Sequence, residues 1–191
     1  LTWRFVRATS GSGVLGDLMG HLADLMHYVV GPIGSITAAT GLYLAERPAL
    51  PGSPDEGTLL PVENEDYATM LVRFGDTAVG AGALGSLEAS RIAVGPRSEY
   101  GFEIFGTEGS VRWDFERMNE LEIALTRTGA NRGYIRAIAD DYFPGFSRFQ
   151  PSAGTGMGFD DLKVIEAAKF LVGVTGGEAL SSNIHDAVAS A

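Results

Sequence analysis

The sequence between Asp66 and Arg127 carries one strand-like segment after another with no helical segment between them, and this order restricts the fold most. Apolar and polar residues alternate over residues 67–74 and 77–89, on either side of a Gly-Asp pair that is typical of a tight hairpin. Strands that follow one another without a crossover helix pair antiparallel. Further strands of this run are expected over residues 100–105, 110–115 and 120–127.

Helices are expected on both sides of this strand run. Residues 14–30 have helical periodicity that ends at Gly31-Pro32, residues 159–172 form a second amphipathic segment, and another helix begins near Ser182. This order predicts an α+β fold: an open, mainly antiparallel mixed sheet with helices on one face. The uncovered sheet face is a candidate subunit interface. In the second helical segment the apolar residues expected to face inward are Leu162, Ile165, Ala168 and Phe170.

The other segments are predicted from their residue types. The chain opens with a β-prone stretch over residues 1–7, and a second strand is expected over residues 35–46. Several prolines predict a loop over residues 47–64, and the Phe-, Pro- and Gly-rich residues 142–158 predict an ordered loop. Because the chain starts within a strand-like stretch and stops within a helical one, we expect a fragment that is truncated at both ends.

Charge and composition narrow the classes of function. Fourteen basic residues against 24 acidic ones give a net charge of −10, which disfavours nucleic acid and anionic membranes as partners. The absence of cysteine excludes disulfides, thiolate zinc sites and cysteine nucleophiles. No apolar run approaches the roughly 18 residues of a membrane span, and the first residues of the sequence do not show a basic segment followed by an apolar one. We expect a cytoplasmic protein that binds a small molecule through histidine and carboxylate chemistry.

A glycine-rich segment from Gly11 to Gly16 is the first candidate site. It matches the G-x-G-x-x-G pattern, follows a predicted strand and opens a helix, with Glu46 after the next strand, as in a dinucleotide-binding site. The following helix carries charged residues, and the later strands do not alternate with helices, as such a site requires. A tight glycine turn into a helix is the alternative interpretation.

The second candidate is a polar stripe on that helix. Asp17, His21 and Asp24 are spaced by four and three residues, which places them on one face of an ideal α-helix. A carboxylate one turn before an imidazole can orient it as a general base, and Gly20 leaves room for a ligand beside His21. The alternatives are a solvated helix face, a hydrogen-bonded structural histidine and a metal site, although the histidine outside this helix, His185, lies far along the chain.

The residues of both candidates resemble a known family. The segment from Gly11 to Leu25, the Gly31-Pro-Ile-Gly-Ser turn, Glu65-Asp66-Tyr67 and the segment from Glu99 to Asp114 are similar to the C-terminal domain of the glucose–fructose oxidoreductase, inositol dehydrogenase and MocA family. The resemblance extends from about Trp3 to Asn183. It implies that residues 1–191 form a substrate and oligomerisation domain. The family's N-terminal Rossmann domain, which binds NAD or NADP, is then missing from this sequence.

The resemblance also implies roles for individual residues. His21 matches the catalytic histidine, and Asp17 matches the aspartate that binds substrate hydroxyls beside it. Asp24 matches the second acid of the block and is a further candidate for substrate binding. The Glu-Lys-Pro motif that carries the family's catalytic lysine does not occur in this sequence, so we expect this chain alone to be inactive.

The implied reaction is oxidation of a secondary alcohol in a sugar or cyclitol: an inositol, a glucose-like sugar or an anhydrosugar. Trp3, Arg4 and the Phe-rich residues 142–149 are candidates to line the substrate pocket, while Arg91 and Arg97 could reach a cofactor or subunit or remain surface charges. A homodimer or homotetramer is expected through the open sheet face. Two rival hypotheses remain: a non-catalytic relative kept for oligomerisation or ligand binding, and a metal-dependent hydrolase.

Overall fold

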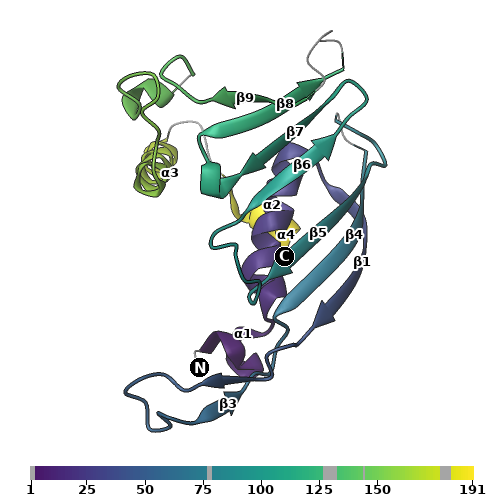
Figure 1. Cartoon of the computed structure of the whole chain (residues 1–191), viewed down its shortest axis with the longest axis vertical. Coiled ribbons are helices and arrows are strands. Elements are labelled where there is room, and N and C mark those ends of the chain that lie inside the picture. Colours follow the sequence, from purple (N-terminus) through teal and green to yellow (C-terminus); the bar gives the residue numbers. More distant parts are fainter. Residues whose placement is uncertain (1–2, 77–78, 127–132, 144, 177–181) are drawn as a thin grey trace. The chain divides into compact units, whose positions relative to one another are not determined.

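The computed structural model in Figure 1 describes residues 3–76, 79–126, 133–143, 145–176 and 182–191. The chain divides into two compact units, one made of Leu1–Gly95 with Asn183–Ala191 and the other of Pro96–Ser182. Each unit contains helices, and the strand pairs between the described residues are antiparallel. The predicted α+β class with antiparallel sheets is therefore confirmed.

The first unit is built on a three-stranded sheet in the order β1-β4-β5. Its strands are β1 (Ile33–Gly41), β4 (Tyr67–Phe74) and β5 (Leu84–Ser90). Alternate residues of β4 are buried, and they share one face of the sheet with the buried Leu87 of β5. The core of this unit therefore lies on that face, and the opposite face carries exposed leucines. The buried residues of β4 are Ala68, Val72 and Phe74.

Helices cover the buried face of this sheet (Figure 1). A π-helical turn η2 (Leu15–Met19) contacts β4 and β5 and continues directly into α2 (Gly20–Val29). The C-terminal helix α4 (Ile184–Ser190) packs against α2 and begins at Asn183, whose side chain accepts from the amide of His185. The helices expected over residues 14–30 and near Ser182 are thus confirmed. Among the described residues no helix is long and apolar enough to cross a bilayer.

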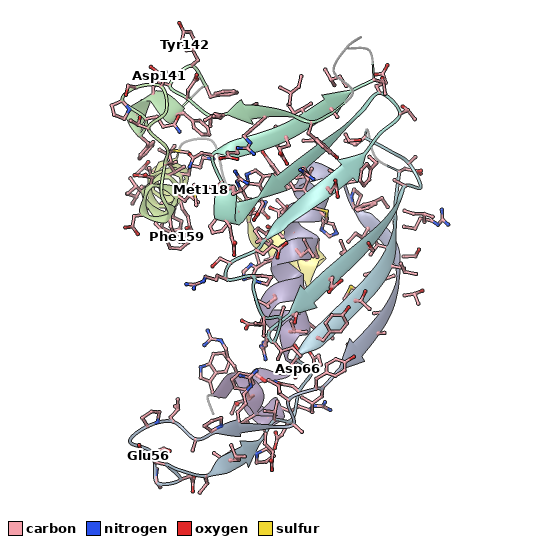
Figure 2. All side chains as sticks on the ribbon, in the orientation of Figure 1. Glu56, Asp66, Met118, Asp141, Tyr142 and Phe159 are labelled. Atoms are coloured by element: carbon pink, nitrogen blue, oxygen red, sulfur yellow. The ribbon has the colours of Figure 1, made fainter. Side chains whose placement is uncertain are left out.

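The second unit contains a four-stranded meander in the order β6-β7-β8-β9. Its strands are β6 (Gly101–Phe105), β7 (Gly109–Asp114), β8 (Glu120–Leu125) and β9 (Ile135–Ile138). Short 3-10 turns η3 (Phe115–Arg117) and η4 (Phe146–Arg148) and the helix α3 (Phe159–Val174) complete it. Phe115 packs edge-on against Phe159 of α3, whereas Tyr142 projects away from the unit (Figure 2).

Three of the predicted local structures were wrong. Residues 3–7 of the opening stretch are not a strand, and residues 1 and 2 lie outside the described part of the chain: η1 (Trp3–Phe5) and α1 (Arg7–Ser10) form instead, because the hydroxyls of Thr9 and Ser10 donate to the Val6 carbonyl. Part of the predicted proline-rich loop is a hairpin of β2 (Glu46–Pro48) and β3 (Leu59–Pro61). The tight turn at Gly75-Asp76 is replaced by a longer connection, since the amide of Phe74 donates to the carbonyl of Ala83.

Two further predictions need correction. The strand expected over residues 35–46 ends at Gly41, because the Asp66 carboxylate accepts from the amides of Tyr43 and Leu44 and turns the chain away from β4. The helix over residues 159–172 is present as α3, but Ala168 and Phe170 are exposed rather than inward. Apolar residues occur all round this helix, so their spacing does not select one face.

Candidate functional site

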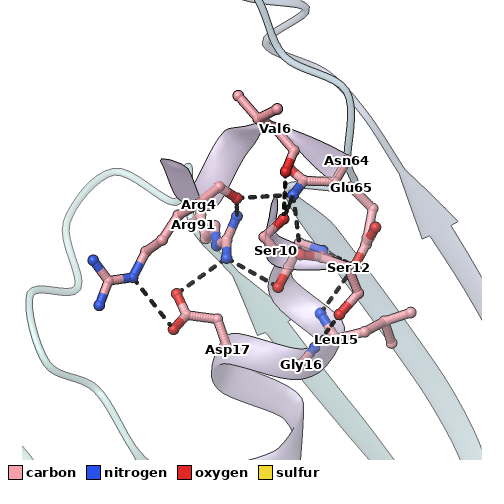
Figure 3. Close-up of polar contacts among 11 residues, drawn as sticks. Arg4, Val6, Ser10, Ser12, Leu15, Gly16, Asp17, Asn64, Glu65 and Arg91 are labelled. Atoms are coloured by element: carbon pink, nitrogen blue, oxygen red, sulfur yellow. Dashed lines mark hydrogen bonds and ion pairs between the residues drawn. The ribbon is translucent and has the colours of Figure 1, made fainter. Parts of the chain in front are cut away.

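Asn64 bonds through its side chain to several nearby segments of the chain on one side of the candidate site (Figure 3). Its side chain is 1% exposed, and its Nδ2 lies 2.8 Å from the carbonyl oxygen of Arg4. The same nitrogen lies 2.8 Å from Ser10 Oγ and 3.0 Å from the carbonyl oxygen of Ser12. Because a buried amide must find acceptors for its hydrogens, this side chain holds η1, α1 and the glycine turn in one arrangement.

Glu65 fills the glycine turn. Its Oε1 accepts from the amides of Gly13 at 2.6 Å and Leu15 at 3.1 Å, and its carbonyl oxygen accepts from the amide of Val14 at 2.9 Å. A Cβ on Gly13 would overlap that carbonyl oxygen. The amides that a pyrophosphate would need are therefore occupied by the protein itself. The turn does not fit a dinucleotide, and the interpretation as a tight turn into a helix is confirmed.

The helix begins with a turn that is wider than an α-helical one. The amide of Gly20 donates to the carbonyl of Leu15, five residues earlier, and Asp17 lies in the middle of this turn. A rotation of 100° per residue therefore does not hold between Asp17 and His21, and the single stripe expected on an ideal α-helix must be corrected. Isolated π turns are frequent at functional sites, and this one displaces Asp17 relative to the helix that follows.

Two arginines reach the Asp17 carboxylate (Figure 3). Arg91 Nη2 lies 3.1 Å from Asp17 Oδ2, and Arg4 Nε lies 3.8 Å from Asp17 Oδ1. The Arg4 guanidinium also stacks over the Trp3 ring, with its carbon 4.9 Å from the ring centroid. The structure thus brings together Trp3, Arg4 and Asp17, three of the predicted substrate contacts. Their role in binding a substrate stays a prediction.

A cavity of about 180 Å³ opens beside this cluster. The residues that line it include an aspartate, two arginines, two serines and a tryptophan. Such groups can bind the hydroxyls and the apolar face of a small polyhydroxylated molecule. The lining residues are Trp3, Arg4, Ser10, Ser12, Gly13, Gly16, Asp17 and Arg91.

The other two predicted site residues lie further along α2, outside that lining. The His21 side chain is exposed at the start of α2, and a Cβ on Gly20, the residue before it, would meet no described atom within 4 Å. Asp24 Oδ1 accepts from Ser190 Oγ at 3.3 Å, which places Asp24 against α4. The general-base role of His21 and the substrate role of Asp24 stay predictions.

The aromatic residues 142–149 and Arg97 belong to the second unit. There the rings of Phe143 and Phe146 lie 6.0 Å apart, and the amide of Arg97 donates to Glu116 Oε1 at 2.7 Å. Two backbone amides, those of Ser98 and Arg97, lower the pKa of the Glu116 carboxyl by bonding to its ionised form. A contribution of this loop to a substrate pocket stays a prediction.

Sequence reasoning missed the partners of Asp17. Arg91 stands 74 residues further along the chain than Asp17, and Asn64 is 60 residues from the Arg4 carbonyl that it binds. No local pattern of the sequence encodes such pairs, and an arginine or asparagine after a strand is more often a surface residue. Within the ranges that the structure describes, no three histidine or acidic side chains gather as metal ligands would.

Comparisons with known proteins agree on one family. The model of the GFO/IDH/MocA C-terminal domain matches residues 1–112. Levoglucosan dehydrogenase of Pseudarthrobacter phenanthrenivorans is 33% identical over 195 residues, covering 97% of this chain and 49% of that protein. A solved levoglucosan dehydrogenase in complex with NADH and levoglucosan has a TM-score of 0.86 at 32% identity, with 100% of this chain and 48% of that chain covered.

A second solved structure gives the same result. An NAD binding oxidoreductase from Klebsiella pneumoniae has a TM-score of 0.85 at 33% identity, with 100% of this chain and 49% of that chain covered. The chain thus spans about half the length of the relatives that it matches. The likeness extends over both compact units, so the fold is shared along the entire chain.

Proposed function

This chain belongs to the GFO/IDH/MocA family, and from that premise we propose that it is the substrate-binding part of an oxidoreductase that oxidises a secondary alcohol of a sugar or cyclitol. The observation that carries the proposal is the cavity whose wall combines the Asp17 carboxylate, the Arg4 guanidinium and the Trp3 ring. The relatives include levoglucosan dehydrogenase, solved with NADH together with levoglucosan or L-sorbose. An anhydrosugar or a ketose-like polyol is therefore the first substrate class to test.

The cofactor is expected to bind mainly outside this chain. The glycine turn does not fit a dinucleotide, because its amides already donate to Glu65. NAD, or alternatively NADP, held by an N-terminal Rossmann domain, would supply the hydride acceptor. Relatives solved with NADH favour NAD.

The residues of this chain would bind and orient the substrate and take its proton. Asp17 would accept hydrogen bonds from hydroxyls next to the reacting carbon, and the Trp3 ring would contact the apolar face of the sugar ring. Arg4 would donate to ring or hydroxyl oxygens. His21, on the next turn, would take the hydroxyl proton as general base. A polyol has several similar carbons, so these contacts would select the one that reacts.

The exposed face of the β1-β4-β5 sheet would hold a second copy of the chain. Leu71 of β4 and Leu84 of β5 are 67% and 72% exposed, and the strand register places both on the face opposite the buried Leu87. Large apolar side chains on an open sheet favour association. A homodimer or homotetramer formed through this face is part of the proposal.

The test is turnover by the full-length gene product. A panel of levoglucosan, L-sorbose, glucose and inositols is assayed with NAD and with NADP, by absorbance of the reduced nicotinamide. Turnover of at least one polyol supports the proposal. Removal of a general base costs roughly 100-fold or more in kcat, so His21→Ala should lose at least that much. The matched control is His185→Ala on α4, whose exposed side chain lies outside the lining of the cavity.

Two results would contradict the proposal. If His21→Ala keeps activity within about tenfold of the wild type, the general-base role is wrong, since such catalysis is worth more than that. If the wild type binds a polyol, measured by calorimetry, and reduces neither cofactor, the protein is a ligand-binding relative without catalysis.

A further inference from the structure

We propose that Arg91 is a positioning residue that holds the Asp17 carboxylate in the orientation needed to bind substrate hydroxyls. The inference rests on the proposed function, since it concerns the same cavity. Arg91 follows the last residue of β5, and its own backbone amide donates to the carbonyl of Asp66 at 2.9 Å. This arginine is therefore fixed at its main chain by the end of the sheet.

The guanidinium of Arg91 is buried and makes two bonds with one nitrogen. Only 9% of its side chain is exposed, and Nη2 lies 3.1 Å from Asp17 Oδ2 and 2.9 Å from the carbonyl oxygen of Gly13. The guanidinium carbon also lies 5.4 Å from the centroid of the Phe5 ring. A buried cation must be paired, and the Asp17 carboxylate and the Gly13 carbonyl are the acceptors that pair it.

The contacts close a ring around Asp17. The backbone amide of Asp17 donates to the Gly13 carbonyl at 3.2 Å, and the same carbonyl accepts from Arg91 Nη2. Arg91 Nη2 also donates to Oδ2 of the Asp17 side chain, which completes the ring. The side chain of Asp17 is thus fixed relative to its own backbone by one intervening arginine nitrogen. Glu65 holds the other side of the same turn through the amide of Gly13.

The two arginines at Asp17 differ in what they can do. Arg91 is buried and occupies Oδ2, whereas Arg4 has a side chain that is 51% exposed and lies 3.8 Å from Oδ1. Oδ1 is therefore the oxygen that remains to accept a hydrogen bond from a substrate hydroxyl in the cavity. Arg4 is placed to meet the substrate, and Arg91 is placed to aim the carboxylate at it.

The experiment is a double-mutant cycle on the full-length gene product with the polyol that it oxidises. Arg91→Met keeps much of the length and the apolar stem of the side chain and removes the guanidinium with its donors. Without Arg91 the Asp17 carboxylate would lose its hydrogen bond with the substrate hydroxyl. Such charge-assisted bonds are worth about 1.5–3 kcal/mol, so KM should rise roughly 10- to 100-fold. In the Asp17→Asn background the same change should raise KM less than about threefold, because the carboxylate that Arg91 positions is already gone.

Two further variants separate positioning from general damage. Arg91→Lys keeps a cation with several donors and should recover part of the lost affinity. Arg117→Met is the matched control: Arg117 pairs with the Glu120 carboxylate in the second unit and does not line the cavity, so the KM of this variant should equal that of the wild type. Thermal unfolding of each variant is followed in parallel. If Arg91→Met does not fold, the cycle is run with Arg91→Lys, which should raise KM when Asp17 is intact and leave it unchanged in the Asp17→Asn background.

The outcomes are distinct. Additive effects of the Arg91 and Asp17 substitutions on KM would overturn the positioning role while leaving the proposed function intact. A fall in kcat with unchanged KM would also overturn it, since orientation of a binding carboxylate acts first on affinity. Absence of polyol turnover in the wild type would refute the proposed function itself, and the inference with it.

Discussion

Gly13 and Glu65 approach so closely that residue 13 has no room for a side chain. A Cβ at this position would overlap the Glu65 carbonyl oxygen, which itself accepts from the neighbouring amide of Val14. The glycine pattern that resembles a nucleotide site in the sequence is thus explained by contact between two segments of the protein. Here the chain between β3 and β4 meets the turn that precedes the helix.

Gly13→Ala should therefore destabilise the protein strongly. The main chain at residue 65 or the turn itself must move, and overpacking of this kind costs about 1–3 kcal/mol or more. Gly20→Ala is the matched control: its Cβ would meet no described atom, and an alanine in a helix gains up to about 1 kcal/mol over glycine. Urea unfolding measures both. Equal stability of the two variants would contradict the role assigned to Gly13.

The same control carries a second expectation. Gly20 precedes His21, and a Cβ on it would meet no described atom within 4 Å. Under the proposed function the substrate would approach the imidazole past this position. Gly20→Ala should keep or raise the free energy of unfolding and yet raise KM for the polyol several-fold. Steady-state kinetics beside urea unfolding checks this. An unchanged KM would show that the substrate does not pass over this position.

Asn64→Asp should damage the site from a distance. The substitution keeps the shape of the side chain but replaces its donor with an oxygen, which would face the Arg4 and Ser12 carbonyls in a buried place. An unsatisfied buried group of this kind costs about 1–3 kcal/mol, and more when charged. The midpoint of urea unfolding should fall. A midpoint equal to that of the wild type would show that Asn64 does not hold η1 and the turn together.

The second unit should lose stability in mild acid. Hydrogen bonds from the amides of Ser98 and Arg97 hold the pKa of Glu116 below its usual value of 4.5. A carboxyl whose pKa is lowered by folding contributes stability above its unfolded pKa, and loses it as pH falls through the folded pKa. The pKa of Glu122 is lowered in the same direction by its hydrogen bond from Arg112.

Glu116→Gln isolates one of these groups. The variant should be less stable than the wild type at pH 7, and the two should converge as the pH falls from the usual carboxyl value of 4.5 through the lowered pKa of folded Glu116, because the wild-type carboxyl then becomes protonated. Chemical unfolding at a series of pH values between about 3 and 7 provides the measurement. A difference that stays constant across this range would exclude the carboxylate charge as the cause.

Association through the open sheet face can be tested with one charge. Leu71→Lys places a cation in the middle of that face and should convert the proposed homodimer or homotetramer into monomers, since an unpaired charge is costly to bury in an interface. Val94→Lys is the matched control: Val94 is 99% exposed in the same unit but lies beyond β5, off the sheet. Light scattering after size-exclusion chromatography gives the mass. A mass unchanged by Leu71→Lys would place the interface elsewhere.

Local patterns in the sequence predicted much of the fold. The alternation over residues 67–74 predicted β4 with the bounds that the structure shows, and the meander from β6 to β8 was also expected, because such strands pair with their sequence neighbours. The predictions failed where the outcome depends on distant segments. Residues 3–5 have β-prone side chains, yet they form a 3-10 turn whose Arg4 carbonyl is bound by Asn64.

The candidate site divides in the same way. The sequence by itself determined that a glycine turn leads into a helix and that Asp17, His21 and Asp24 stand on it, since spacing along a chain is a local property. Only the tertiary structure decided that a π turn displaces Asp17 and that Arg91 and Arg4 are its partners. The hydrogen bonds that fix this arrangement join segments that are far apart in the chain and become buried together. Leu15 and Glu65 are 50 residues apart, and Gly13 and Arg91 are 78 residues apart. No local pattern in the sequence records such pairs.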